Sequence, residues 1–165
     1  MSIPKAWKEM VHRYVATHVA LSGEVVAIAR LRPIGGSPEA LLADLLADAA
    51  LDDAMRGELM VLPSETYLFE VMASGTRKAD PGAIHAAREG LKAAIGTALA
   101  DELNALHARA SAVSLDDPAG RGARKVKTIA LGLIAAADPA KAAELAAAQF
   151  DAADNMTDRQ GALMV

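Results

Sequence analysis

A helix-capping residue followed directly by proline occurs four times along this chain. The side chain of the capping residue accepts a hydrogen bond from the first helical turn. Proline suits the next position, because its missing N–H needs no partner there and its fixed φ matches a helix. Each occurrence therefore predicts the start of a helix. The four signals are Ser37-Pro38, Asp80-Pro81, Asp117-Pro118 and Asp138-Pro139.

The segments after these signals repeat apolar residues with the period of a helix. Between Pro81 and about Ala112 only Gly90 and Gly96 interrupt the pattern, which predicts one helix of roughly 30 residues and about 45 Å. We interpret the two glycines as sites where another helix crosses closely, rather than as hinges. The other apolar faces are Leu41, Leu42, Leu45, Leu46 and Ala49 after the first signal, and Val126, Ile129, Ala130, Leu133, Ile134 and Ala137 after the third.

The remaining sequence predicts shorter helices separated by polar loops. Alanine, the best helix former, makes up about a quarter of the residues, whereas aromatic residues make up 3%. We predict an all-α fold in a single domain over 1–165, built as an irregular stack of antiparallel helix pairs of the HEAT or armadillo kind. A compact bundle is the alternative. The shorter helices are expected over 4–21, 24–31, 53–62, 64–73 and 139–153, and the loops over 32–36, 74–79 and 114–122.

The last residues of the chain resemble a helix that has only just begun. Asn155-Met156-Thr157-Asp158 is a helix-opening signal with Thr157 as the predicted cap, and the chain stops at Val165. A helix of one or two turns is marginal by itself. We therefore expect this chain to be a truncated part of a larger helical domain; the alternative is a frayed natural terminus.

Composition excludes several classes of protein. The chain has no cysteine, which removes disulfides, thiolate nucleophiles and thiolate metal sites. Its net charge of −4 argues against nucleic acid as the main partner. The longest apolar run, 128–137, is far shorter than the roughly 20 residues of a membrane span. The N-terminus shows no signal pattern, so we expect a cytoplasmic protein.

The histidines offer no complete metal or catalytic site in the sequence. His12 and His18 lie on different faces of their predicted helix. His85 and Glu89 share a face at i,i+4, but two ligands are too few for a zinc site, so we interpret them as surface hydrogen-bonding residues. His107 is isolated, and we expect it to be solvated.

Other polar clusters also have structural interpretations. Paired carboxylates, at Asp52-Asp53, Asp101-Glu102 and Asp116-Asp117, suit the positive end of a helix dipole. The segment Gly35-Gly36-Ser37 lacks the lysine of a phosphate-binding loop, and we expect an ordinary loop.

Four basic residues, Arg121, Arg124, Lys125 and Lys127, have no aromatic neighbours for base stacking. They predict a solvated face or a contact with an acidic partner. We therefore assign no catalytic, cofactor-binding or metal-binding residue to this chain.

Three stretches from Leu62 onward carry a family resemblance. The first is Leu62-Pro63-Ser64-Glu65, followed by Asp80-Pro81, Ile84-His85 and Arg88-Glu89. The second is 99–103, and the third runs from Gln149-Phe150 through Ala153-Asp154-Asn155-Met156-Thr157-Asp158 to Ala162-Leu163. In these stretches the chain resembles the C-terminal helical domain of bacterial aminopeptidase N, a zinc-dependent family. Residues 1–60 resemble that domain only loosely, and Trp7 is the residue there on which the alignment with the family rests.

The resemblance implies a non-catalytic role. The zinc of that family is held in its catalytic domain by a His-Glu-x-x-His motif and a later Glu, and this sequence contains no such motif. We expect a fragment whose partner is the catalytic domain of a parent peptidase, where it caps that domain and shapes the access of peptides. Apolar surface left uncovered predicts self-association. The alternative is a free-standing helical-repeat module that binds another protein.

Overall fold

The computed structural model describes residues 37–73, 79–114 and 116–165, and every regular element in these ranges is a helix. The helices expected over 4–21 and 24–31, Trp7 and the loop over 32–36 lie outside the described residues. The described helices are α2 (Pro38–Ala47), α3 (Asp53–Met60), α4 (Glu65–Ala73), α5 (Pro81–Ala98), α6 (Ala100–Ser111), α7 (Gly120–Ala137), α8 (Pro139–Ala152) and α9 (Met156–Leu163).

Three of the four proline signals begin helices as predicted. Ser37, Asp80 and Asp138 each accept a hydrogen bond from the first turn of α2, α5 and α8. The fourth prediction is wrong. Asp117 accepts from the N–H of Ala119 at 2.8 Å and Gly120 donates to its carbonyl, so Asp117-Pro118 forms a turn. Helix α7 starts only at Gly120, which also shortens the loop predicted over 114–122.

The single helix predicted over 81–112 is two helices, α5 and α6, that meet at Leu99. The backbone of Leu99 has φ −118° and ψ 30°, outside the helical range. Hydrogen bonds still run from its N–H to Ile95 and from Leu103 to its carbonyl, so the chain bends without a loop. Both α5 and α6 pack against α7, which is only 18 residues long. A straight helix of about 45 Å would extend past α7, which is about 27 Å long, whereas the bent pair α5 and α6 contacts α7 with both helices.

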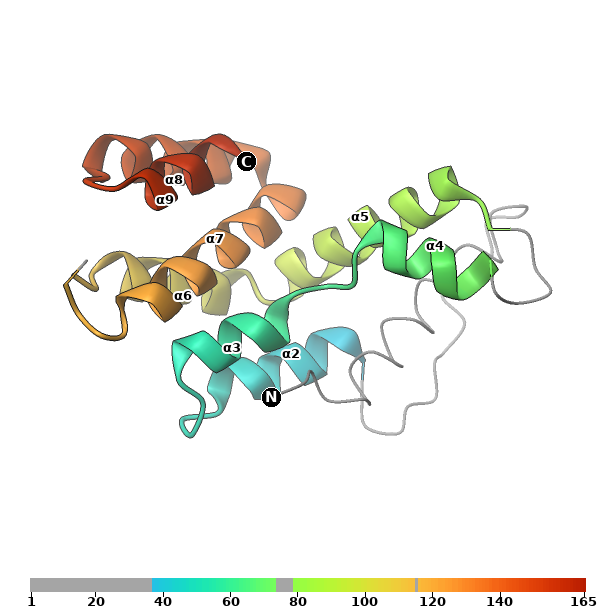
Figure 1. Cartoon of the computed structure of the whole chain (residues 1–165), viewed down its shortest axis with the longest axis horizontal. Helices are drawn as coiled ribbons and strands as arrows, with labels where there is room; N and C mark the ends of the chain where they lie inside the picture. The colour runs from blue at the N-terminus through green and yellow to red at the C-terminus, as the bar shows by residue number, and fades with distance from the viewer. Residues whose placement is uncertain (1–36, 74–78, 115) are drawn as a thin grey trace.

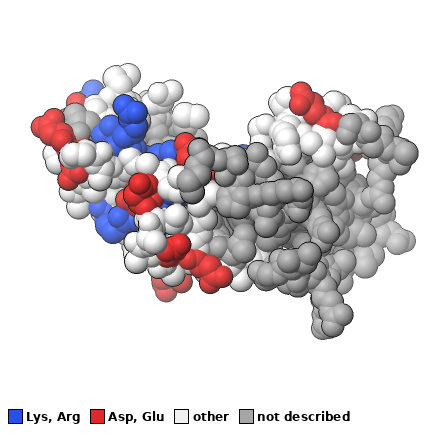
Figure 2. Space-filling view, turned by 60° about the horizontal axis from the view of Figure 1, so that its bottom comes forward, with Lys and Arg blue, Asp and Glu red and all other residues white. Residues whose placement is uncertain are grey.

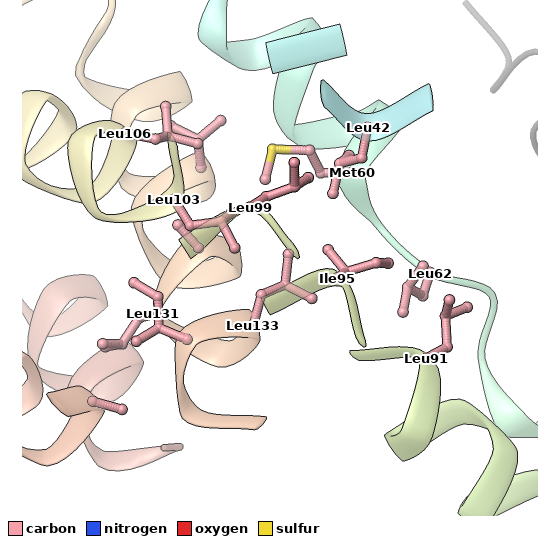
Figure 3. Close-up of a cluster of buried hydrophobic side chains, with 14 of the residues drawn as sticks. Leu42, Met60, Leu62, Leu91, Ile95, Leu99, Leu103, Leu106, Leu131 and Leu133 are labelled. Carbon is pink, nitrogen blue, oxygen red and sulfur yellow. The ribbon is translucent and has the colours of Figure 1, made fainter. Parts of the chain in front are cut away.

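Helix α7 is the centre of the structure and packs against α3, α5, α6, α8 and α9 (Figure 1). Its predicted apolar face is confirmed, since Val126, Ala130, Leu133 and Ile134 are buried. Leucine, isoleucine and methionine side chains from five helices and the adjoining segments join it in one cluster, part of which is drawn in Figure 3. Labelled members are Leu42, Met60, Leu62, Leu91, Ile95, Leu99, Leu103, Leu106, Leu131 and Leu133.

Glycines allow the helices around α7 to approach its backbone. A Cβ on Gly96 would overlap the carbonyl oxygen of Leu133, so the predicted close crossing is confirmed there. A Cβ on Gly122 would lie 2.5 Å from the backbone nitrogen of Ala54 in α3. The same prediction is wrong for Gly90, which is exposed and whose Cβ would meet nothing within 4 Å.

The last helix, α9, forms with a different cap from the one predicted. Asn155, rather than Thr157, is the N-cap, and its side chain accepts from the N–H of Asp158 at 2.9 Å. Helix α9 lies beside α8 and also contacts α7 (Figure 1). Gly161 faces Thr128 of α7, where a Cβ would lie 2.8 Å from the hydroxyl oxygen. Tertiary contacts thus support a helix of only 8 residues.

Candidate functional site

The described residues form a pocket of about 520 Å³ between α6, α7, α8 and α9. Its walls combine small apolar residues with a concentration of polar side chains. Three of these side chains, on His107, Lys127 and Gln149, are among the four polar or charged residues that are buried in the described part of the chain. The polar lining consists of Asn104, His107, Ser111, Ser114, Arg124, Lys127, Gln149, Asp154, Asn155 and Asp158.

His107 is buried with 5% exposure, so the prediction of a solvated residue is wrong. Its Nε2 lies 3.1 Å from Oε1 of Gln149, whose Nε2 donates to the carbonyl of Asp158 at 2.8 Å. Because the amide oxygen of Gln149 is the acceptor, the imidazole must carry its proton on Nε2. Burial lowers the pKa of His107, against an opposing effect of the Gln149 hydrogen bond. The ring is therefore a neutral donor that joins α6 to α8.

Lys127 and Asp158, which also line the pocket, form an ion pair. The Nζ of Lys127 lies 2.8 Å from Oδ1 of Asp158, and the two side chains are 7% and 13% exposed. Oδ1 of Asp158 accepts no hydrogen bond from the described residues, so the contact with Lys127 is an ion pair. Burial raises the pKa of Asp158, but Lys127, Asn155 and Arg124 outweigh that effect and hold it below its usual value. The pair ties the first turn of α9 to α7.

The four basic residues near the start of α7 do not form one solvated face. Arg121 is exposed, and Lys125 forms an ion pair with Glu58 of α3. Lys127 is buried, which contradicts the prediction for that residue, and the half-buried Arg124 lines the pocket. Lys and Arg alternate with Asp and Glu over the described part of the face in Figure 2. Helical spacing of α7 explains the split, since successive residues point in different directions.

The polar side chains of the pocket contact one another across the helices. His107 is hydrogen-bonded to Gln149, Gln149 donates to the carbonyl of Asp158, and the carboxylate of Asp158 pairs with Lys127. The hydrogen bond from His107 to Gln149 fixes the proton on Nε2 and leaves Nδ1 as the basic nitrogen of the ring. Because these contacts link α6 to α8 and α7 to α9, we interpret the network as a polar clamp that holds the four helices together.

A second cluster joins α4 to α5 at the other end of the described structure. His85 Nδ1 lies 2.9 Å from Oε1 of Glu65, which confirms the surface hydrogen-bonding role predicted for His85. Glu89 adds a third candidate ligand, and one ligand atom from each residue lies within 4.8 Å of the others. The sequence indicated only two ligands here, because Glu65 is 20 residues away from His85.

Asp53 carries a contact that the sequence did not indicate. Asp52 caps α3 and bonds the N–H of Met55 at 2.7 Å, as expected for a carboxylate at a helix start. Asp53 instead pairs with the buried Arg56 and with Arg109 of α6. The hydrogen bond from Arg109 is the largest cause that lowers the pKa of Asp53. This pair connects α3 to α6.

Two further sequence candidates lie outside the described residues. These are His12 with His18, and the glycines of Gly35-Gly36-Ser37. Ser37 itself is the N-cap of α2, where its hydroxyl oxygen accepts from the N–H of Ala40. Within the described ranges, no helix is long and apolar enough to cross a membrane.

Residues 7–165 match a family model described as a domain of unknown function (DUF3458_C) with ARM repeats. The chain belongs to this family. Its ARM repeats agree with the predicted stack of helix pairs and favour it over a compact bundle. The fold class inferred from the proline signals and apolar periods is thus confirmed, apart from the bend at Leu99.

This member of the ARM-repeat family matches part of each of two larger known proteins. It is 34% identical over 120 residues to aminopeptidase N of Caulobacter vibrioides, covering 72% of this chain and 13% of that protein. Its fold is similar to part of the crystal structure of Legionella pneumophila aminopeptidase A in complex with aspartic acid, with a TM-score of 0.73 and 23% identity. That similarity covers 95% of this chain and 18% of the other. The chain therefore spans a small fraction of the proteins it matches.

Proposed function

We propose that this chain is a non-catalytic helical module of an aminopeptidase N-type zinc metallopeptidase. In that role it packs on the catalytic domain and limits which peptides reach the active site. The observation that carries the proposal is the match to aminopeptidase N at 34% identity, confined to 13% of that protein's length. An ARM-repeat family match over 7–165 supports a helical module rather than a catalytic unit.

The chemistry of the chain agrees with this role. Zinc peptidases of this kind need a His-Glu-x-x-His motif to bind the metal and activate water, and the sequence has none. In the pocket, His107 and Asp158 are engaged with Gln149 and Lys127. We propose that the zinc and the reacting groups belong to another part of the parent protein.

Exposed apolar side chains provide surface for packing within a larger protein. Val61, Tyr67 and Phe69 at α4 and the segment before it are about 40% exposed, and Met156, Leu163 and Met164 at α9 are about 75% exposed. Large apolar side chains with so much exposure are candidates for coverage by another protein surface. Helices α4 and α9 lie at opposite ends of the described stack (Figure 1).

The absence of catalysis is tested on the purified chain. An alanyl chromogenic substrate, incubated with the chain and added zinc, should show no hydrolysis above a buffer control. The parent-type enzyme from Caulobacter vibrioides serves as the positive control. Metal-dependent turnover that follows the chain through purification and is abolished by a chelator would overturn the proposal.

A further inference from the structure

Three side chains with metal-binding atoms meet where α4 begins beside α5. Glu65 is the first residue of α4, and His85 and Glu89 lie one turn apart on α5. Residues at i and i+4 point to the same side of a helix, here the side that meets Glu65. Helix α4 lies along α5 at this end of the molecule (Figure 1).

The geometry is already close to what a metal ion requires. His85 Nδ1 and Glu65 Oε1 are 2.9 Å apart, and one ligand atom from each of the three residues lies within 4.8 Å of the others. Ligand atoms around a tetrahedral zinc ion, at about 2.0–2.2 Å from the metal, lie roughly 3–4 Å from one another. The side chains of His85 and Glu65 are 63% and 45% exposed, so they rotate without disturbing the core.

We propose that Glu65, His85 and Glu89 bind a zinc ion that bridges α4 and α5. One imidazole nitrogen and two carboxylate oxygens are ligands that zinc accepts, whereas magnesium and calcium favour oxygen alone. Three protein ligands leave one position open for water. The proposal rests on these three side chains and does not depend on the proposed function.

The neighbours of Glu89 set the strength of binding. Lys92 Nζ lies 2.9 Å from Oε2 of Glu89, and Arg88 Nη1 lies 3.3 Å from Oε1. A bound zinc ion must share the carboxylate with these cations, which weakens its binding. The site therefore holds an exchangeable ion, and Lys92→Gln should tighten zinc binding by removing the closer competitor.

The bridge would act on α4, which packs mainly against α5. Its core contribution within the described residues is Leu68, with Met72 partly buried beside it. A metal that joins residue 65 to residues 85 and 89 holds the start of α4 against α5. Binding to the native state alone raises the unfolding midpoint as zinc is added.

The test is a zinc titration of the full chain, followed by thermal unfolding and by calorimetry. The variants are His85→Ala and Glu65→Gln, and the matched control is Glu70→Gln, an exposed carboxylate on the same helix. At about ten times the zinc dissociation constant, wild type and Glu70→Gln should gain about 4 °C in midpoint. His85→Ala and Glu65→Gln should lose most of that gain, and calcium should produce none. Cobalt in place of zinc should give visible absorption bands that His85→Ala abolishes.

Two results would overturn the proposal. The first is no zinc-dependent change in the wild-type chain. The second is an equal change in wild type and His85→Ala, which would place the ion on other groups of the chain. Comparison of each variant without zinc keeps a folding defect separate from a loss of binding.

Discussion

Arg109 on α6 donates two hydrogen bonds to the carboxylate of Asp53 on α3, at 2.8 and 2.9 Å, across 56 residues of sequence. Asp53 also accepts from Arg56 at 2.5 Å. Arg56 is buried, and its other nitrogens reach the carbonyls of Leu45 and Asp48. One carboxylate thus neutralises a buried guanidinium and fastens α3 to α6.

Asp53→Asn should cost about 1.5–3 kcal/mol of unfolding free energy, because it removes charge-assisted hydrogen bonds and leaves Arg56 without its counter-ion. Arg109→Gln should cost less, below about 1 kcal/mol of unfolding free energy, because the side chain of Arg109 is 53% exposed. In this variant Asp53 still pairs with Arg56. Urea unfolding of both variants measures the two effects.

The control is Asp151→Asn, because Asp151 is an exposed carboxylate on α8; this substitution should change the free energy of unfolding little.

The lowered pKa of Asp53 makes the contribution of the Asp53 contacts to stability depend on pH. Its contribution is complete above the usual aspartate pKa of about 3.9 and is lost as pH falls below it. Equal losses in Asp53→Asn and Arg109→Gln would argue against a special role for Asp53.

Gly90 and Gly96 on α5 should respond to alanine in opposite directions. Gly90 faces open space, so Gly90→Ala should stabilise the chain by about 0.5–1 kcal/mol through helix propensity. Gly96→Ala would place a methyl group on the carbonyl of Leu133 and against Ala137, and should cost about 1–3 kcal/mol. Thermal or urea unfolding of the pair decides the matter; a stabilising Gly96→Ala would mean that α5 and α7 are farther apart than described.

The buried His107 should make the chain less stable as pH falls below about 6.5, the ordinary histidine value. Its pKa is lowered in the folded state, so the unfolded chain binds the proton first. Lys127 opposes protonation and Asp158 favours it, and burial is the largest effect. Stability should therefore be complete above that pH and decline from there towards the lower folded pKa.

Urea unfolding of wild type and His107→Gln at several pH values between 7 and 5 measures this contribution as the difference between their unfolding free energies. The advantage of wild type over the variant should shrink as pH falls, because the variant has no imidazole at position 107 to protonate. NMR of the His107 ring measures the pKa directly. A His107 that titrates at or above the ordinary histidine value would contradict its burial beside Gln149.

Exposed apolar side chains on and after α9 should cause self-association. Leu163 and Met164 are 75% and 76% exposed. Light scattering should show a mass that grows with concentration, and Leu163→Gln with Met164→Gln should reduce that growth. The control is Ala105→Gln, an exposed substitution on α6. A wild-type chain that stays monomeric at high concentration would contradict this prediction.

Local signals in the sequence predicted helix starts and apolar faces well. A capping side chain next to proline acts within one turn, which is why Ser37, Asp80 and Asp138 were identified correctly. The bend at Leu99 had no proline to mark it. It depends on how α5 and α6 pack on α7, and the local sequence around Leu99 does not mark such a tertiary requirement.

Contacts between residues far apart in the sequence build the candidate sites, and local patterns do not indicate them. The sequence predicts a solvated His107, because its partner, Gln149, is 42 residues away on another helix. Glu65 and His85 also meet only through the packing of α4 on α5. A polar residue on a helix is assigned to solvent by default, and only the positions of the other helices show when that assignment is wrong.

The most direct test of the proposed function is a replacement within the Caulobacter vibrioides aminopeptidase N. The segment that matches this chain is exchanged for the corresponding residues of this chain, and rates are measured on an alanyl chromogenic substrate and on a longer peptide. A module that packs on the catalytic domain should give a folded enzyme that keeps most of its activity and its ratio of short-substrate to long-substrate rates. The control exchange inserts an unrelated helical-repeat segment of equal length and should fail. The proposed role would be contradicted if the enzyme carrying this chain lost folding and activity to the same extent as the enzyme carrying the unrelated segment.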